Sequence, residues 1–152
     1  MLRDDLNLAL KSAMKAKEKR STTTLRLIMA AIKDRDIAAR EKDNYDGIDE
    51  QEILALLQKM VKQRRETIEI YENAGRQETA DQEREEIEVI ERFLPRAMSE
   101  EEIAEAVAKV IDETGASSVK DMGQVMAQLR SLYTGQMDFG KASGLIKDRL
   151  CS

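Results

Sequence analysis

The chain contains no histidine and no tryptophan, one cysteine, one proline and only 3% aromatic residues. The lack of histidine excludes Ser-His-Asp and Cys-His nucleophile pairs and His-ligated zinc. The lone Cys151 excludes an intrachain disulfide. Any catalysis would have to use carboxylates, lysine or tyrosine alone. We therefore expect no self-contained catalytic site, no metal site and no cofactor.

Long apolar runs are also absent, because no stretch approaches the roughly 18 residues needed to span a bilayer. The first twenty residues contain no continuous apolar signal core. We expect a cytoplasmic protein that does not use a membrane. A basic amphipathic start also resembles an organelle transit peptide, but Asp4 and Asp5 argue against this reading because such peptides contain few acids.

Hydrophobic residues make up 41% of the 152 positions, and β-branched and aromatic clusters are sparse. This composition predicts an all-α fold. Eight methionines contribute to the apolar positions, among them Met29, Met60, Met122 and Met126. Their helical spacing predicts that they fill the core, with an adaptable docking surface as the alternative.

Residues 1–95 have the periodicity of a four-helix region, with helices expected over 2–19, from 21 to about 41, from 49 to 75 and from 79 to 94. The segment 42–48 reads as a loop. The expected boundary residues are Ser21 and Asp49 with Glu52 as caps, Gly75 as a stop, Thr79 as a cap and Pro95 as the last stop. Pro95 separates this N-terminal domain from the rest of the chain.

Residues 96–152 predict a small C-terminal three-helix bundle. Ser99 and Glu102 form a capping box for its first helix, which should end at Gly115. Gly135 breaks the second helix, and Asp138 can cap the third. The whole chain is thus expected to be a four-helix region followed by a three-helix bundle.

The net charge of −5 is unevenly distributed. Residues 1–42 hold eleven basic and six acidic side chains, whereas residues 43–95 hold seven and fifteen. Residues 96–113 are acidic, and residues 114–152 are mildly basic with five cations against three acids. A basic patch is expected near the N-terminus, made of Lys11, Lys15, Lys19 and Arg20.

Two charged runs in the middle of the chain are interpreted as solvated helix faces. Four cations lie between Lys59 and Arg65, and acids on the same helix, Glu66, Glu69 and Glu72, are expected to pair with them. Contact with a phosphate backbone or an acidic partner is the alternative. The acidic run from 83 to 91 alternates with arginines, which favours an exposed helix over a metal or acid-base site.

Three glycines, Gly123, Gly140 and Gly144, fall inside expected helices, where each is less favourable than alanine by about 0.8–1 kcal/mol. Something should compensate for this loss. Either neighbouring helices approach closely at these positions, which we favour, or bare backbone at a helix start admits a ligand or an RNA phosphate.

Several segments in order resemble the YqeY proteins of bacteria over nearly the whole chain. Residues 19–33 read KRSTTTLRLIMAAIK, residues 62–76 read KQRRETIEIYENAGR, and residues 86–95 read EIEVIERFLP. Two further segments, DMGQVM at 121–126 and GQMDFGK at 135–141, resemble the tail shared by this family and GatB, the B subunit of tRNA-dependent amidotransferases.

This GatB/YqeY resemblance implies an all-α fold and partners rather than chemistry. The tail resembles a tRNA-facing module, and a carbon-nitrogen ligase activity with glutamine as amido-N donor would be inherited through it by analogy alone. The chain departs from the usual pattern at Gln136 and Met137, where a more basic pair is common. That difference and the acidic net charge weaken an RNA-contact reading of this turn.

Three hypotheses remain open. The first is a non-catalytic accessory protein that contacts tRNA or a tRNA-handling enzyme. The second is a protein-interaction adaptor or self-associating module unrelated to RNA, and the third, least favoured, is an amide-transfer enzyme. The candidate binding residues of the tail are Lys120, Gly123, Arg130, Gly135, Gly140, Lys141 and Lys147.

Overall fold

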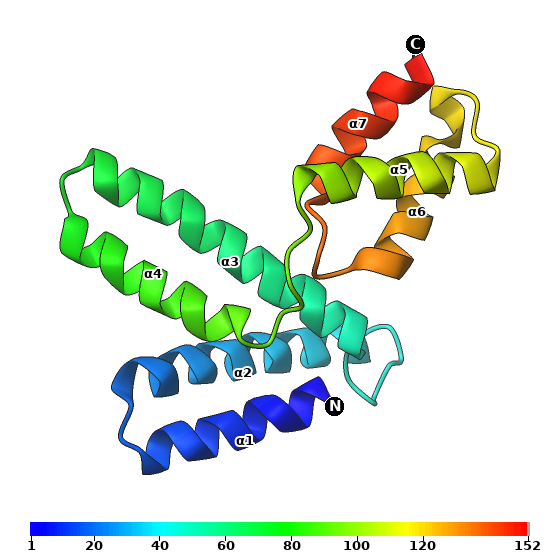
Figure 1. The fold of residues 1–152 in the computed structure, drawn as a ribbon. Helices are drawn as coiled ribbons and strands as arrows, with labels where there is room; N and C mark the ends of the chain where they lie inside the picture. Colours follow the sequence, from blue (N-terminus) through cyan, green and yellow to red (C-terminus); the bar gives the residue numbers. More distant parts are fainter. Residues whose placement is uncertain (152) are drawn as a thin grey trace. The chain divides into compact units, whose positions relative to one another are not determined.

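A computed structural model describes residues 1–151 and confirms the all-α fold class. It contains seven α-helices and one short 3-10 helix within these residues (Figure 1). The elements are α1 (Leu2–Lys15), α2 (Lys19–Arg40), α3 (Glu50–Asn73), α4 (Gln77–Glu91), α5 (Glu100–Thr114), η1 (Val119–Asp121), α6 (Met122–Tyr133) and α7 (Phe139–Cys151). They form two compact units, Met1–Pro95 and Arg96–Ser152.

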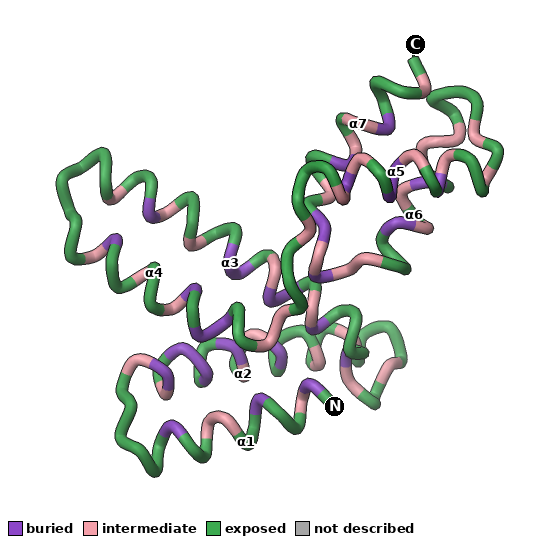
Figure 2. Tube along the Cα trace, viewed as in Figure 1, coloured by how far each residue is buried: buried purple, intermediate pink, exposed green. Residues whose placement is uncertain are grey.

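In unit 1, α1 packs against α2 and α3 packs against α4, while α2 also contacts α4 (Figure 1). Each helix turns its apolar stripe inward, so purple buried positions alternate with green exposed ones along the tube in Figure 2. The fully buried side chains of this core include Leu6, Ile28, Ile32, Leu57 and Ile90.

The first residues of unit 1 are fixed by polar contacts as well as by burial. The backbone N–H of Leu2 donates to Glu50 Oε1 on α3 at 2.8 Å, and Leu2 and Leu6 are buried. Arg3 on α1 pairs with Asp36 on α2. The segment proposed as an alternative transit peptide is therefore a packed helix of this unit.

In unit 2, α5 packs against both α6 and α7, and η1 contacts α6 and α7. The buried side chains include Val107, Val125, Leu129, Met137 and Ile146. The N–H of Met98 donates to the carbonyl of Gln136 at 2.9 Å, which ties the start of the unit to the turn before α7.

Four expected helix boundaries are confirmed. Asp49 accepts a hydrogen bond from the Glu52 N–H, and Ser99 with Glu102 forms a capping box. The C-cap of α5 is Gly115, which adopts a left-handed conformation at φ +68°. Asp138 caps α7, as predicted.

Two expected caps are wrong. Helix α2 begins at Lys19 behind Glu18, so Ser21 is a buried residue inside the helix. Helix α4 begins at Gln77, directly after Arg76, so Thr79 also lies within a helix. The expected first helix is shorter than predicted, because α1 ends at Lys15.

The expected role of the four named methionines is confirmed. Met60 is buried in unit 1, and Met29 packs against that core. Met122 and Met126 pack against the core of unit 2. Met137, which departs from the usual basic residue of the resemblance, is fully buried there, so this position supplies core volume rather than surface charge.

Candidate functional site

The predicted binding residues of unit 2 lie in two places. Arg130 lies in the last turn of α6, Gly135 lies in the following turn, and Gly140 and Lys141 lie in the first turn of α7. Lys120 lies in η1 and Gly123 in the first turn of α6, at the other end of that helix. Lys147 lies farther along α7, and η1 contacts this helix.

The amides at the start of α7 already have an acceptor. Asp138 Oδ1 accepts from the Gly140 N–H at 2.9 Å and from the Lys141 N–H at 3.3 Å. Amides at a helix start have no acceptor within the helix, so they are the donors that a bound anion would use. A phosphate at this position would have to displace the Asp138 carboxylate.

The expectation of close helix packing is wrong for all three interior glycines. A Cβ atom built at Gly123 or Gly144 meets no atom within 4 Å. At Gly140 the nearest atom is the capping oxygen of Asp138, at 3.2 Å. Bare backbone therefore faces open space at Gly123 and Gly144 rather than a neighbouring helix.

The four tail cations have different surroundings. The Lys141 ammonium lies 3.3 Å from Glu100 Oε1, and the Arg130 guanidinium lies 5.8 Å from the centre of the Phe139 ring. Lys120 and Lys147 are exposed, and no carboxylate within residues 1–151 pairs with them. Three of the four cations, all except Lys141, are thus available to an anionic partner.

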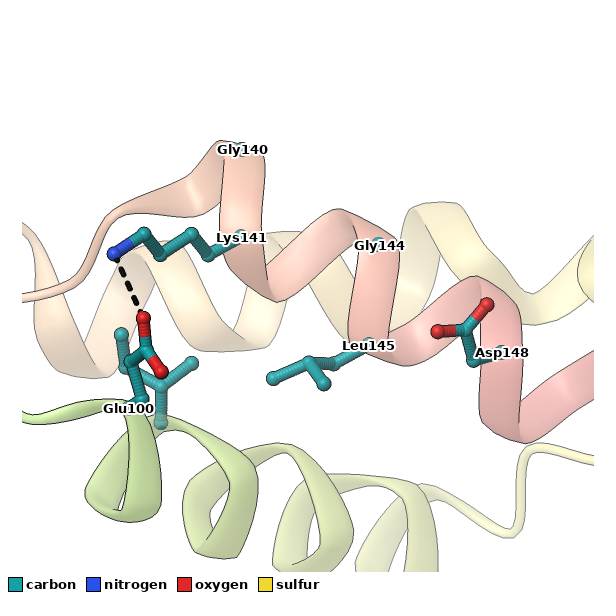
Figure 3. Close-up of a pocket in the computed structure, with 7 residues that line it drawn as sticks. Glu100, Gly140, Lys141, Gly144, Leu145 and Asp148 are labelled. Atoms are coloured by element: carbon teal, nitrogen blue, oxygen red, sulfur yellow. Dashed lines mark hydrogen bonds and ion pairs between the residues drawn. The ribbon is translucent and has the colours of Figure 1, made fainter.

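A groove of about 390 Å³ lies between α5 and α7 (Figure 3). Ile103 and Leu145 give it an apolar wall, and the open backbone of Gly144 widens it. The Lys141–Glu100 pair and Asp148 supply its charged groups. The lining residues are Glu100, Ile103, Gly140, Lys141, Gly144, Leu145 and Asp148.

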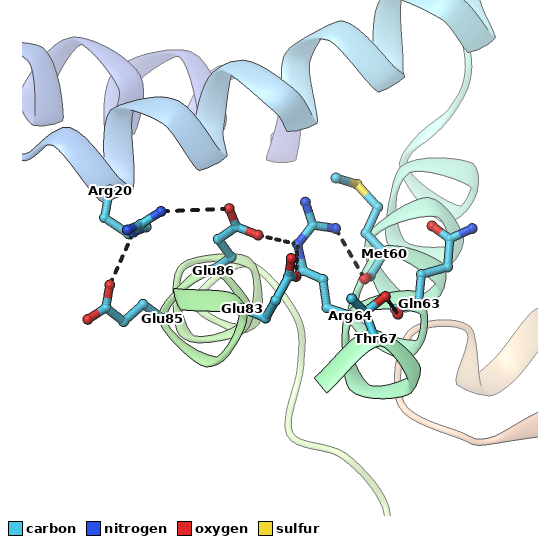
Figure 4. Close-up of polar contacts among 8 residues, drawn as sticks. All are labelled: Arg20, Met60, Gln63, Arg64, Thr67, Glu83, Glu85 and Glu86. Carbon is cyan, nitrogen blue, oxygen red and sulfur yellow. Dashed lines mark hydrogen bonds and ion pairs between the residues drawn. The ribbon is translucent and has the colours of Figure 1, made fainter. Parts of the chain in front are cut away.

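The second predicted basic patch is smaller than expected. Lys11, Lys15 and Lys19 are exposed on either side of the turn between α1 and α2. Arg20 instead points toward α4, where its Nε lies 3.1 Å from Glu85 and its Nη1 lies 4.0 Å from Glu86 (Figure 4). Arg20 is therefore already committed to contacts inside unit 1.

The expected ion pairs within α3 are replaced by pairs between α3 and α4. Arg64 Nε lies 3.0 Å from Glu86 and 3.9 Å from Glu83, and its Nη1 donates to the Met60 carbonyl (Figure 4). The side chains of Arg64 and Glu86 are only 15% and 14% exposed. Two further pairs between these helices are Arg65 with Glu91 and Arg84 with Glu72.

This network also corrects the picture of a wholly exposed acidic run. Burial raises the pKa of the Glu83 carboxyl, and the neighbouring Glu86 charge raises it further. Arginines on α2 and α3 alternate with these carboxylates, so the network joins three helices. Its role is structural. Across residues 1–151, no three acidic or cysteine side chains are grouped in a way that could hold a metal ion.

The helices in the described part of the chain are all too short or too polar to cross a bilayer.

These features define a small all-α protein with two compact units and charged, exposed helix faces. A family model described as Yqey-like protein matches residues 3–150. The chain belongs to this family.

The chain is also similar to fungal proteins named "Altered inheritance of mitochondria protein 41, mitochondrial". The protein from Eremothecium gossypii is 30% identical over 146 residues, covering 94% of this chain and 77% of that protein. The one from Lachancea thermotolerans is 33% identical, covering 72% and 57%. The one from Clavispora lusitaniae is 30% identical, covering 99% and 86%.

Proposed function

We propose that the chain is a non-catalytic accessory protein that binds tRNA, or the enzyme that handles it, through unit 2. The observation that supports this most directly is the set of exposed cations without carboxylate partners on η1, α6 and α7, namely Lys120, Arg130 and Lys147. Phosphate backbones bind proteins largely by releasing counterions to such side chains.

The tail glycines fit this proposal in a different way than first expected. Gly123 and Gly144 leave exposed backbone without side-chain cover. Such backbone permits the close approach of a large partner. Because Asp138 occupies the amides at the start of α7, the cationic side chains, rather than that helix start, are the proposed phosphate contacts.

The proposal assigns no ligase activity to the chain itself. The sequence has no histidine and only one cysteine, so it lacks a Cys-His pair for releasing ammonia from glutamine. Carbon-nitrogen ligase chemistry with a glutamine donor would belong to the partner. The proposal includes a cytoplasmic location for this accessory role.

A tRNA titration with a charge-reversed variant tests this function. The double variant carries Lys120→Glu and Lys147→Glu, and the matched control carries Lys109→Glu and Arg76→Glu at exposed positions outside the proposed surface. We expect the double variant to bind tRNA about tenfold more weakly at low salt. The slope of log affinity against log salt should be lower by about two, because two phosphate contacts are lost. Equal binding by the wild type and the double variant would refute the RNA proposal.

A protein adaptor is the second candidate, and the α5–α7 groove favours it. Its apolar wall of Ile103 and Leu145 and its carboxylates at Glu100 and Asp148 suit a basic amphipathic helix better than RNA. Binding of a basic amphipathic helical peptide that persists after nuclease treatment and is lost in Gly144→Leu would favour this candidate. Binding that nuclease abolishes would rule it out.

A further inference from the structure

The outer face of α2 carries a row of cations at seven-residue intervals: Lys19, Arg26, Lys33 and Arg40. All four are exposed. Seven residues make almost two turns of an α-helix, so the four side chains share one face, and neighbours lie about 10.5 Å apart along the axis. The row extends over the length of α2, which begins at Lys19 and ends at Arg40.

The carboxylates near this row do not pair with it. Helical geometry puts Asp34 at one edge of the row and Asp36 at the other. Asp36 is engaged with Arg3 at 2.8 Å, and the more distant Arg40 charge helps to lower the pKa of the Asp36 carboxyl. No carboxylate within residues 1–151 lies at ion-pair distance from any of the four cations.

Helix α1 extends the same basic surface. Arg26 Nη2 lies 4.0 Å from the sulfur of Met14, which is 49% exposed. Lys11 lies one turn before Met14 on α1 and is exposed without an ion-pair partner. The contact of Met14 with Arg26 and the pair of Arg3 with Asp36 show that α1 and α2 run antiparallel. Lys11 therefore lies beside the middle of the row.

The start of the row does not serve the stability of α2, whereas Arg40 in the last turn is favourably placed for the helix dipole. The first turn of α2 contains Lys19 and Arg20 and no acid, although the helix dipole favours acids at this end. The cations are seven residues apart, so they repel one another only weakly and gain no stabilising i,i+4 pair from their own row. Exposed cations without an ion-pair partner in the unit are available to a partner of opposite charge.

We propose that the α2 cationic row binds the phosphate backbone of double-stranded RNA. Evenly spaced cations on a rigid helix match a partner with regularly repeated negative charge. The positions between the cations on this face are Thr23, Ala30 and Ile37. They include no aromatic side chain on which an unpaired base could stack, so a single strand is disfavoured.

A lipid surface is also a poorer partner for this face. Ile37 and Met14 are each 49% exposed, and Leu27 at the edge of the row is 44% exposed, so the larger apolar side chains beside the row are separate from one another. Membrane-bound helices bury a continuous apolar face, whereas the apolar face of α2 lies in the core of unit 1. The contact is therefore with the RNA backbone and is independent of sequence. It lies in unit 1 and does not require the tRNA contact proposed for unit 2.

Titration of a 20-base-pair RNA duplex with the full chain tests this proposal. The row variant carries Arg26→Glu and Lys33→Glu, and the matched control carries Arg76→Glu and Arg92→Glu at the two exposed ends of α4. We expect the row variant to bind about tenfold more weakly at low salt, with a log-log salt slope lower by about two, and the control to change less than about twofold.

Three outcomes would overturn the proposal. These are no binding of the duplex by the wild type at low salt, equal loss in the row variant and the control, or binding of anionic vesicles or an acidic peptide, and not of RNA, that depends on the row. The variant with Lys120→Glu and Lys147→Glu separates the two proposals. If it loses tRNA but keeps the duplex, the α2 cationic row acts by itself.

Discussion

Arg3 and Asp36 form a two-bond ion pair between α1 and α2: Nη1 donates to Oδ2 at 2.8 Å and Nη2 to Oδ1 at 3.1 Å. The same two side chains hold the loop before α3. The Ile48 N–H donates to Asp36 at 2.8 Å, and the Ile48 carbonyl accepts from Arg3 at 3.0 Å. One pair thus fixes three segments of unit 1.

This geometry predicts how acid destabilises unit 1. The hydrogen bond from Arg3 lowers the pKa of the Asp36 carboxyl, and the Ile48 N–H lowers it further. The folded-state pKa lies below the unfolded value, so the stabilisation is present above the unfolded pKa and is lost as pH falls through the folded pKa. We expect Asp36→Asn to lower the free energy of unfolding by about 1–2 kcal/mol at neutral pH. As pH falls below the ordinary pKa of an aspartate, the free energy of unfolding should decrease less steeply in this variant than in the wild type. Urea denaturation across pH measures both effects, and an unchanged pH profile would contradict the assignment.

Glu83 should behave in the opposite way. Burial raises the pKa of its carboxyl, so the ionised form is disfavoured in the folded state and the folded state gains stability as pH falls through this raised pKa. We expect Glu83→Gln to raise the free energy of unfolding at neutral pH by a few tenths of a kcal/mol, which is roughly the size of a charge interaction near the protein surface. The matched variant Glu86→Gln should destabilise, because it removes the closest carboxylate from Arg64, whose side chain is only 15% exposed. Destabilisation of equal size in both variants would show that the ionised Glu83 carboxylate is not disfavoured in the folded state.

Thr24 lies in the core of unit 1 with a hydroxyl that lacks a hydrogen-bond partner among residues 1–151. A buried polar group without a partner costs about 1–3 kcal/mol. We therefore expect Thr24→Val, which keeps the shape, to raise the midpoint of chemical denaturation, equivalent to roughly 1 kcal/mol. Thr24→Ser, which keeps the hydroxyl and removes a methyl group, should lower it. A loss in both variants would indicate that the hydroxyl does find a partner.

The glycines of unit 2 should respond differently to alanine. Gly144 has open space for a Cβ atom within a helix, so Gly144→Ala should stabilise α7 by about 0.8–1 kcal/mol. Gly135 has φ +88°, a conformation that alanine rarely adopts, so Gly135→Ala should destabilise by about 1–2 kcal/mol. Hydrogen exchange of the α7 amides measures both changes. A loss of protection in Gly144→Ala would contradict the open geometry.

Local chemistry made much of the fold predictable from the sequence. Asp49, Ser99 and Asp138 cap helices as expected because each side chain bonds amides only two or three residues away. Ser21 and Thr79 were wrongly assigned as caps for the same local reason. Each is a good cap in isolation, but the short turns before α2 and α4 start these helices earlier, at Lys19 and Gln77.

The contacts of the candidate sites were less predictable, because they depend on the register between helices. The sequence predicts that the cations of α3 pair with acids on the same helix. In the structure, Arg64 and Arg65 pair with Glu86 and Glu91 on α4. The loss of Arg20 from the basic patch has the same origin, since its partners lie 65 and 66 residues ahead. The seven-residue spacing of the α2 cationic row is visible in the sequence, but whether carboxylates pair with its cations depends on the register between α1 and α2.

The hydrogen bond from the Leu2 amide to Glu50 has a practical meaning for anyone handling this protein. The second amide of the chain is bound to a helix 48 residues away, so a fusion tag joined ahead of Met1 starts almost against folded structure. A reporter placed there needs a flexible spacer so that it does not displace α1 from its packed position in unit 1.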